Sequence, residues 1–285
     1  MRLKKIFLTL AIITAILTVS AQLPVASGNN ATYGNNKKTG KFLNTRGFKM
    51  YYEVYGTGKP LLLIHGNGGS IKDFSKQIPY FSRQCKVIVA DSRAQGKSVD
   101  PGDSLNYEMM ADDLNALLDE LQLDSCNVIG WSDGGIDGLL LAMRHPEKVK
   151  KLAITGANLW PDSTALDPFI YKWITAGADS LAKVKQTPEI KNQYKLMEMM
   201  MKEPNITLQQ LHDIQCPVLV IGGDHDAITT KHTLQIAEAI PCSYLWILPH
   251  SGHSTLINYS SQFNETVNDF FRKPYKAIDG LDRLN

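Results

Sequence analysis

Short apolar runs alternate with longer amphipathic segments over most of this chain. The runs that we assign to strands lie at 61–64, 87–90, 126–129, 152–155, 217–221 and 244–248. Helical spacing of apolar residues predicts helices at 71–81, 107–121, 136–144, 230–240 and 259–271. Unbroken apolar strands are typical of a sheet covered on both faces. Strands that alternate with helices indicate βαβ units, so the predicted fold class is α/β with a mostly parallel sheet.

The segment 107–121 has the clearest helical pattern. Its apolar face carries Met110, Leu114, Leu117, Leu118 and Leu121 at helical spacing. Its polar positions, which we expect to face solvent, are Asp112, Asp113, Asn115 and Asp119. One apolar face and one charged face indicate a helix that packs on the sheet from one side.

The alternation of strands and helices stops after Gly156. No buried strand is visible from 158 to 213, where helical pieces carry Trp160 and a methionine run, 197–201. We interpret this stretch as a helical cap inserted over the edge of the sheet. Methionine and tryptophan suit an adaptable apolar pocket, which makes Trp160 our candidate substrate-binding residue in the cap. Ordinary packing between helices is the alternative.

The pattern divides the chain into five parts. They are a signal peptide (1–21), a flexible leader (22–40), the first part of an α/β core (41–157), the helical cap (158–213) and the second part of the core (214–285). The core begins with a predicted hairpin over 41–54, which turns at Arg46-Gly47.

The first residues have the form of a secretory signal. Basic residues precede an apolar run at 6–19, and Val19-Ser20-Ala21 follows as a site of small residues. This order predicts export to the periplasm or the medium, with no stable membrane association after cleavage. An uncleaved anchor is the alternative.

Composition and charge narrow the function classes. The 285 residues are 44% hydrophobic, and the formal net charge is +2. A balance so close to neutral provides no electrostatic footprint for nucleic acid, so we expect a small-molecule partner. The four cysteines form no Cys-x-x-Cys pair, which leaves a zinc site unsupported. Export would allow a disulfide, and Cys216 with Cys242 is the pair to test because both precede neighbouring predicted strands.

The candidate chemistry centres on Gly130-Trp131-Ser132-Asp133-Gly134, between a predicted strand and a predicted helix. This Gly-x-Ser-x-Gly order is typical of a nucleophile elbow, a sharp turn that exposes the serine hydroxyl at a helix N-terminus. The alternative is a glycine-rich turn with an incidental serine. The two interpretations are distinguished by whether the chain also supplies a base and an acid for Ser132.

A serine hydroxyl needs a base, and the base needs a third group that orients it. Two later loops can supply them, and each directly follows a strand. Gly223-Asp224-His225-Asp226 contains two acids, and His250-Ser251-Gly252-His253 contains two histidines. The order of serine, acid and histidine is that of a hydrolytic triad, but spacing alone leaves two candidates for each partner. We expect no metal at His250 and His253, since no third ligand is near.

These motifs resemble the α/β-hydrolase superfamily over nearly everything past Lys41. The resemblance implies that Asp226 is the acid and His253 the base, with Ser132 as the nucleophile. It also implies an oxyanion hole made by the backbone N–H groups of Asn67 and Asp133, the former in the loop His65-Gly66-Asn67. It implies no cofactor.

Within that superfamily, Gly130 to Ile136 (Gly-Trp-Ser-Asp-Gly-Gly-Ile) is similar to the valacyclovir-hydrolase-like group. That group hydrolyses esters of α-amino acids. The resemblance therefore implies that Asp133 pairs with a substrate ammonium and is substrate-binding. Helix capping is the alternative, because an acid in a first helical turn is favoured by the dipole.

The sequence thus predicts a serine hydrolase that cleaves carboxylic esters of small molecules, among them α-amino acid esters, through an acyl-enzyme. Carbon–carbon bond hydrolases and cofactor-free perhydrolases share the same three residue types and stay open as alternatives. So does a non-catalytic binding protein on this fold, since fold alone does not prove function. The sequence does not predict the oligomeric state.

Overall fold

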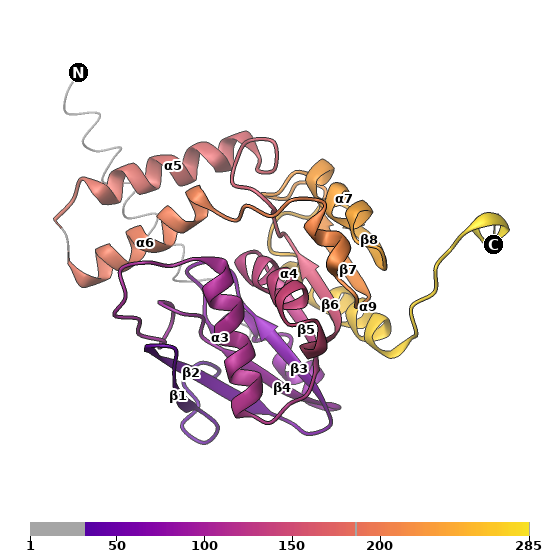
Figure 1. The fold of residues 1–285 in the computed structure, drawn as a ribbon, viewed down its shortest axis with the longest axis horizontal. Coiled ribbons are helices and arrows are strands. Elements are labelled where there is room, and N and C mark those ends of the chain that lie inside the picture. Colours follow the sequence, from indigo (N-terminus) through magenta and orange to yellow (C-terminus); the bar gives the residue numbers. More distant parts are fainter. Residues whose placement is uncertain (1–31, 186, 285) are drawn as a thin grey trace.

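A sheet of eight strands, in the order β1-β2-β4-β3-β5-β6-β7-β8, runs through the middle of the molecule (Figure 1). The computed structural model describes residues 32–185 and 187–284, so the predicted signal peptide and the first half of the leader lie outside the described residues. The strands are β1 (Lys41–Thr45), β2 (Phe48–Tyr55), β3 (Lys59–Ile64), β4 (Cys85–Ala90), β5 (Cys126–Trp131), β6 (Val149–Thr155), β7 (Val218–Gly223) and β8 (Ser243–Leu248). The predicted α/β class is confirmed.

The strand directions bring several loops to one edge of the sheet. β2 is antiparallel to β1 and β4, whereas β4, β3, β5, β6, β7 and β8 pair in parallel. The register pairs Ile64 with Gly130 and Trp131 with Thr155 near the strand ends. Because parallel strands end at the same edge, the loops after β3, β5, β6, β7 and β8 meet there.

Helices cover both faces of the sheet. The α-helices are α2 (Ile78–Phe81), α3 (Tyr107–Glu120), α4 (Asp133–Arg144), α5 (Pro168–Ala182), α6 (Pro188–Lys202), α7 (Thr230–Ala239), α8 (Thr255–Asn258) and α9 (Ser260–Arg272). The 3-10 helices are η1 (Ile71–Phe74), η2 (Pro146–Lys148), η3 (Gln210–Asp213) and η4 (Gly280–Leu284). Helices α3, α4 and α7 share one apolar cluster with one face of the sheet, and α2, α8 and α9 share another with the opposite face.

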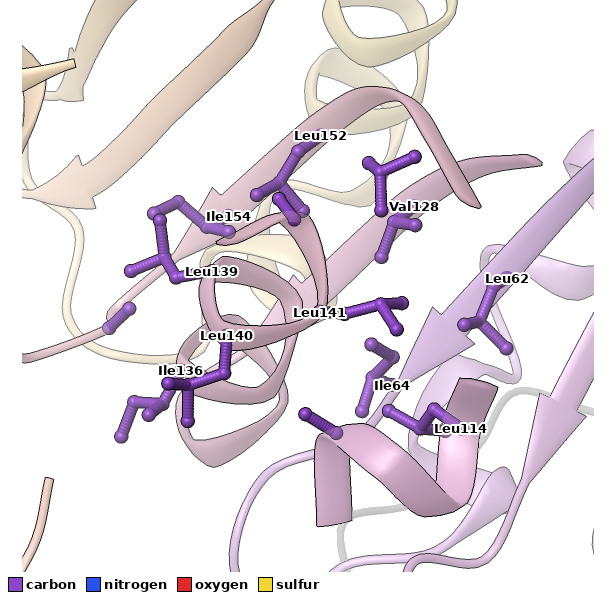
Figure 2. Packing of buried hydrophobic residues seen from close by; sticks show 14 of the residues in the cluster. Leu62, Ile64, Leu114, Val128, Ile136, Leu139, Leu140, Leu141, Leu152 and Ile154 are labelled. Carbon is purple, nitrogen blue, oxygen red and sulfur yellow. The ribbon is translucent and has the colours of Figure 1, made fainter. Parts of the chain in front are cut away.

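The packing of α4 holds the turn at its beginning in place. Figure 2 shows side chains of α4, such as Leu139 and Leu141, gathered with Ile64 of β3, Ile154 of β6 and Leu114 of α3. Each such side chain contributes roughly 1.5–3 kcal/mol when it is fully buried. The helix that follows Ser132 therefore cannot easily shift against the sheet.

The predicted helix at 71–81 is wrong in detail. The segment forms two short pieces, η1 and α2, in place of one helix. Pro79 has no N–H group and cannot continue a helix from Ser75, but it fits the first turn of a new one.

The predicted solvent-facing position of Asp113 is also wrong. Its side chain is buried, and Arg93 donates to it from Nε and Nη2 over 2.7 and 2.8 Å. The Arg93 guanidinium also lies 3.9 Å from the ring centroid of Phe48. Arg93 belongs to the loop after β4, so the ion pair attaches that loop to α3.

The segment that we predicted as a cap contains α5 and α6, which lie side by side at one end of the sheet (Figure 1). They share a small apolar cluster that includes Ile174 and Met197. Hydrogen bonds from two side chains fasten α6 to the core. Lys195 Nζ donates to Asp100 Oδ2 over 2.7 Å and to the Gly102 carbonyl over 2.8 Å, and Asn192 Nδ2 donates to the Ala94 carbonyl over 2.6 Å.

All four cysteines have free thiols, so the structure does not contain the Cys216–Cys242 disulfide. The two residues are neighbours at the start of β7 and β8, as the sequence predicted. Within residues 32–185 and 187–284, no helix is long and apolar enough to cross a membrane.

Candidate active site

Ser132 occupies a strained turn between β5 and α4. Its φ and ψ are 56° and −120°, a region that residues with a β-carbon rarely adopt. Both flanking glycines are needed for close packing. A β-carbon on Gly130 would lie 2.1 Å from the carbonyl oxygen of Gly134, and one on Gly134 would lie 2.0 Å from that of Ile64. The turn at Ser132 therefore has the geometry of the predicted nucleophile elbow.

The structure brings Ser132, His253 and Asp226 together in one hydrogen-bonded chain. Ser132 Oγ lies 2.9 Å from His253 Nε2, and His253 Nδ1 lies 2.6 Å from Asp226 Oδ1. The three side chains come from loops after β5, β8 and β7. In this arrangement His253 can accept the hydroxyl proton while Asp226 stabilises the resulting positive charge.

The two acids of the β7 loop have different partners. Asp226 is fully buried at its side chain and also accepts from the backbone N–H groups of Gly223 and Ile228, each over 3.2 Å. Burial raises the pKa of Asp226, but His253 and these two N–H groups together hold it below its ordinary value. Asp224 instead accepts from the backbone N–H groups of His250 and Ser251. Asp224 thus shapes the histidine loop, and the carboxylate against His253 belongs to Asp226.

Besides its hydrogen bonds to Ser132 and Asp226, His253 has further contacts that fix its position. Its carbonyl oxygen accepts a hydrogen bond from Trp131 Nε1 over 2.9 Å, which joins the loop after β8 to the residue before Ser132. Its ring lies against Gly156, where a β-carbon would be 2.7 Å from Cε1. We did not predict a role for Gly156 from the sequence. A glycine directly after a buried strand was the available signal.

The loop after β3 lies against the serine. A β-carbon on Gly66 would be 3.0 Å from the β-carbon of Ser132. Within the described parts of the chain, no acceptor pairs with the backbone N–H of Asn67 or of Asp133. Two free donors beside a serine hydroxyl are what an oxyanion hole requires.

His65 supports that loop from behind. The backbone N–H of Ser92 donates to His65 Nε2 over 2.9 Å, so the ring proton must be on Nδ1. Nδ1 lies 2.8 Å from the carbonyl oxygen of Gly66 and therefore donates to it. His65 is buried and packs the loop.

The Asp133 carboxylate lies inside the protein. It is 4% exposed, accepts from Asn67 Nδ2 over 2.8 Å and is hydrogen-bonded to the Tyr107 hydroxyl. Burial raises the pKa of Asp133 to about 6, and the two hydrogen bonds oppose that rise. At neutral pH the carboxylate is mostly ionised, and so can pair with a cation.

A second acid, Asp137, lies one helical turn further along α4. It is fully buried, and neither of its carboxylate oxygens has a partner among the described residues. Burial, together with the charges of Asp133 and Asp113, raises the pKa of Asp137 well above its ordinary value. We missed Asp137, although its spacing of four residues from Asp133 was a signal. Tyr107, in contrast, reaches Asp133 from another helix, and no local pattern indicates that contact.

The structure places the Trp160 ring in packing contacts. The ring is edge-on to His232, with centroids 4.5 Å apart, and its Nε1 donates to Thr164 Oγ1 over 2.8 Å. Burial lowers the pKa of His232 to about 4, so this neighbour is neutral at neutral pH. These contacts hold the Trp160 ring, which lies in the loop after β6, against α7, and substrate binding by Trp160 stays a prediction.

A cavity of about 520 Å³ adjoins the base. His253 and Asp226 line it together with other residues of the loop after β7 and with residues at the start of α5 and α7. The loop residues are Asp224, His225 and Ala227, and the helix-start residues are Asp167, Ile170, Thr229 and Thr230. Its size suits a small molecule. In the described parts of the chain, no cluster of three His, Cys, Asp or Glu side chains could hold a metal ion.

Comparison with known proteins supplies independent information. A family model for the alpha/beta hydrolase fold matches residues 59–197. A serine hydrolase named BPHL from Mus musculus is 29% identical over 266 residues, which cover 85% of this chain and 89% of that protein. A 2-hydroxymuconate semialdehyde hydrolase from Pseudomonas sp. (strain CF600) is 25% identical over 83% of this chain and 95% of its own length.

Solved structures agree on the fold. A hydrolase from Pseudomonas aeruginosa PA01 superimposes with a TM-score of 0.72 at 20% identity. The match covers 84% of this chain and all of that one. At this identity the likeness concerns the fold alone.

Proposed function

We infer that the chain belongs to the α/β-hydrolase superfamily, and it resembles the valacyclovir-hydrolase-like group of that superfamily. From this premise we propose that it is a serine hydrolase of small carboxylic esters, with a preference for esters of α-amino acids. The observation that carries the proposal is the hydrogen-bonded chain from Ser132 through His253 to Asp226.

The first half of the reaction forms an acyl-enzyme. Ser132 Oγ attacks the ester carbonyl carbon while His253 Nε2 takes the hydroxyl proton. The carbonyl oxygen becomes an oxyanion, which accepts from the backbone N–H groups of Asn67 and Asp133. A donor of this kind is worth about 2.7–4 kcal/mol toward the tetrahedral intermediate. The intermediate collapses as His253 returns the proton to the departing alkoxide, and the alcohol leaves.

The second half regenerates the enzyme. Water attacks the acyl carbon and gives a proton to His253, and a second tetrahedral intermediate uses the same two donors. Collapse releases the acid, and the proton returns to Ser132 Oγ. Asp226 stays ionised throughout, which its lowered pKa supports. Its negative charge stabilises the imidazolium in both halves.

The preference for α-amino esters rests on Asp133. Its carboxylate belongs to the residue next to Ser132, and Asn67 and Tyr107 hold it in place with two hydrogen bonds. An α-ammonium is separated from the ester carbonyl by one carbon, so an acid beside the oxyanion site suits it. A charge-assisted contact in a partly buried site is worth about 1.5–3 kcal/mol, or one to two decades in kcat/KM.

A second candidate function, carbon–carbon bond hydrolysis, is also supported by a specific observation. A relative named for 2-hydroxymuconate semialdehyde suggests hydrolysis of a carbon–carbon bond by the same three side chains. The buried Asp133 disfavours such a substrate, because a negative charge next to the oxyanion site would repel an anionic dienoate.

A matched pair of substrates tests the proposal. The p-nitrophenyl esters of valine and of 3-methylbutanoic acid differ only in the α-amino group. We expect both to be cleaved, with kcat/KM at least tenfold higher for the valine ester at pH 7. A fluorophosphonate probe should label the wild-type protein and fail to label Ser132→Ala. Labelling of both proteins, or of neither, would contradict the assignment of Ser132.

A further inference from the structure

The two residues that provide the proposed oxyanion donors are also joined through their side chains. Asn67 Nδ2 donates to Asp133 Oδ2 over 2.8 Å. Asn67 lies in the loop after β3, and Asp133 is the first residue of α4. The bond therefore connects two separate elements across the serine. Because the Asp133 carboxylate is buried and ionised, the hydrogen bond is stronger than one between neutral groups.

The loop around Asn67 makes its other side-chain hydrogen bonds to residues outside α4. Gly66 and Gly68 flank Asn67, and Gly68 has a φ of +66° with open space around its α-carbon. His65 and Gln95 hold these glycines from the side of the β4 loop: His65 donates to the Gly66 carbonyl, and Gln95 Oε1 accepts from Gly68 N over 2.6 Å. Among the described residues, the side-chain bond to Asp133 is the hydrogen bond that ties Asn67 itself to the nucleophile's helix.

A second residue, besides Asn67, keeps the Asp133 carboxylate in place. The Tyr107 hydroxyl, on α3, is hydrogen-bonded to Asp133, while the backbone of Asp133 begins the tightly packed α4. Asp133 is therefore held by its own helix and by α3, whereas Asn67 reaches it from a loop in which both neighbouring residues are glycines. An oxyanion hole functions only when both donors lie about 2.7–3.1 Å from the oxyanion.

We propose that the Asn67 side chain is a positioning residue, which sets the separation of the two oxyanion donors by holding the Asp133 carboxylate. The inference rests on the proposed function, in which these donors stabilise the tetrahedral intermediate. It assigns the Asp133 carboxylate a second task besides substrate recognition. That task is needed for neutral esters as well, since they form the same oxyanion.

The experiment compares Asn67→Ala, Asp133→Ala and the double variant on the neutral p-nitrophenyl ester of 3-methylbutanoic acid. Asn67→Ala keeps the backbone N–H and removes only the side-chain bond. We expect kcat to fall about 10- to 100-fold in each single variant, with KM changed less than threefold. The kcat of the double variant should be no more than about threefold below that of the less active single variant, because both changes break the same hydrogen bond. Additive losses would overturn the proposal.

A tetrahedral mimic separates positioning from folding. Ser132 Oγ adds to the carbonyl carbon of a trifluoromethyl ketone while the serine hydroxyl proton passes to His253 Nε2. The former carbonyl oxygen becomes an oxyanion that accepts from the two donors. The Ki of the ketone should rise in Asn67→Ala by the same factor as kcat/KM falls. A variant that is only partly folded would have fewer active molecules but an unchanged Ki. An unchanged Ki would therefore overturn the proposal.

Gln84→Ala is the matched control. It removes an amide that donates to Asn268 Oδ1 over 2.7 Å, at the opposite end of β4 from the site. Both kcat and Ki should stay within twofold of wild type. Failure of the proposed function looks different: wild type itself would then fail to bind the ketone. If wild type binds it and Asn67→Ala binds it equally well, the positioning role alone is wrong.

Discussion

Gly156 provides the space that the His253 ring occupies. A β-carbon on Gly156 would lie 2.7 Å from Cε1 and 2.8 Å from Nδ1 of that ring, and 3.7 Å from Asp226 Oδ1. The end of β6 thus forms the wall against which the proposed base rests. Gly156 also has a φ of +67°, so both its backbone conformation and its missing side chain are used.

We expect Gly156→Ala to lower kcat for a neutral ester about 10- to 100-fold. The added methyl group must push the imidazole away from Ser132 Oγ, and near-attack geometry tolerates little displacement. The free energy of unfolding should fall by about 1–3 kcal/mol, because alanine is strained at this φ. Steady-state kinetics and urea unfolding measure the two effects. Gly47→Ala is the control: Gly47 has a φ of +82° with nothing within 4 Å, so the free energy of unfolding should fall by a similar amount while kcat is retained.

The two acids of the β7 loop should differ sharply on substitution. Asp226→Asn should lower kcat by roughly 10⁴, since an amide cannot stabilise the imidazolium and favours the wrong tautomer of His253. Asp224→Asn keeps one of the two oxygens that accept from the backbone N–H groups of His250 and Ser251. Because the Asp224 side chain is not the one hydrogen-bonded to His253, we expect a loss below about tenfold. Measuring kcat of both variants on one p-nitrophenyl ester tests this difference. Equal losses would contradict the assignment of Asp226.

The preference for amino esters should depend on pH. Burial raises the pKa of Asp133 from its ordinary value to about 6, so the carboxyl is mostly protonated below that pH and cannot pair with an ammonium. The ratio of kcat/KM for the amino ester to that for its des-amino counterpart should therefore rise as pH increases through about 6. It should fall again where the substrate amine loses its proton, roughly pH 7.7–8.0 for an α-amino group.

Using a ratio removes the pH dependence that both substrates share. The charged and titratable groups around Asp133 are His65, His253, Tyr107 and Asp137. The ratio should lose its rise near pH 6 in Asp133→Asn. A ratio that is flat from pH 5 to 7 in wild type would contradict the pairing of Asp133 with the ammonium.

The buried ion pair of Arg93 and Asp113 should dominate the stability of the loop after β4. Arg93→Met should lower the free energy of unfolding by up to about 3–5 kcal/mol, because the buried Asp113 carboxylate then keeps only the half-exposed Arg46 as an ionic partner among the described residues. The double variant Arg93→Met/Asp113→Leu should recover much of that loss. Arg144→Ala, which breaks a half-exposed pair with Asp112, should cost no more than about 1 kcal/mol. Urea unfolding of the four proteins measures all three effects.

The sequence by itself determined the order of elements and the location of the chemistry. Apolar runs such as 61–64 and the glycines around Ser132 act through local backbone preferences, so they could be read without the fold. The hairpin that turns at Arg46-Gly47 and the position of the cap between β6 and β7 follow from the same local signals. The signal peptide stays a prediction, because residues 1–21 lie outside the described part of the chain.

Only the tertiary structure decided which polar groups meet. Resemblance had indicated Asp226 over Asp224, but the direct reason is that one carboxylate faces His253 and the other faces the backbone of residues 250–251. Asp113 has the local pattern of a surface residue, yet Arg93 from another loop buries it. Asn67 and Asp133 are 66 positions apart in the chain and 2.8 Å apart in space. Contacts between distant residues depend on how strands align and helices pack, and periodicity within one element carries no information about them.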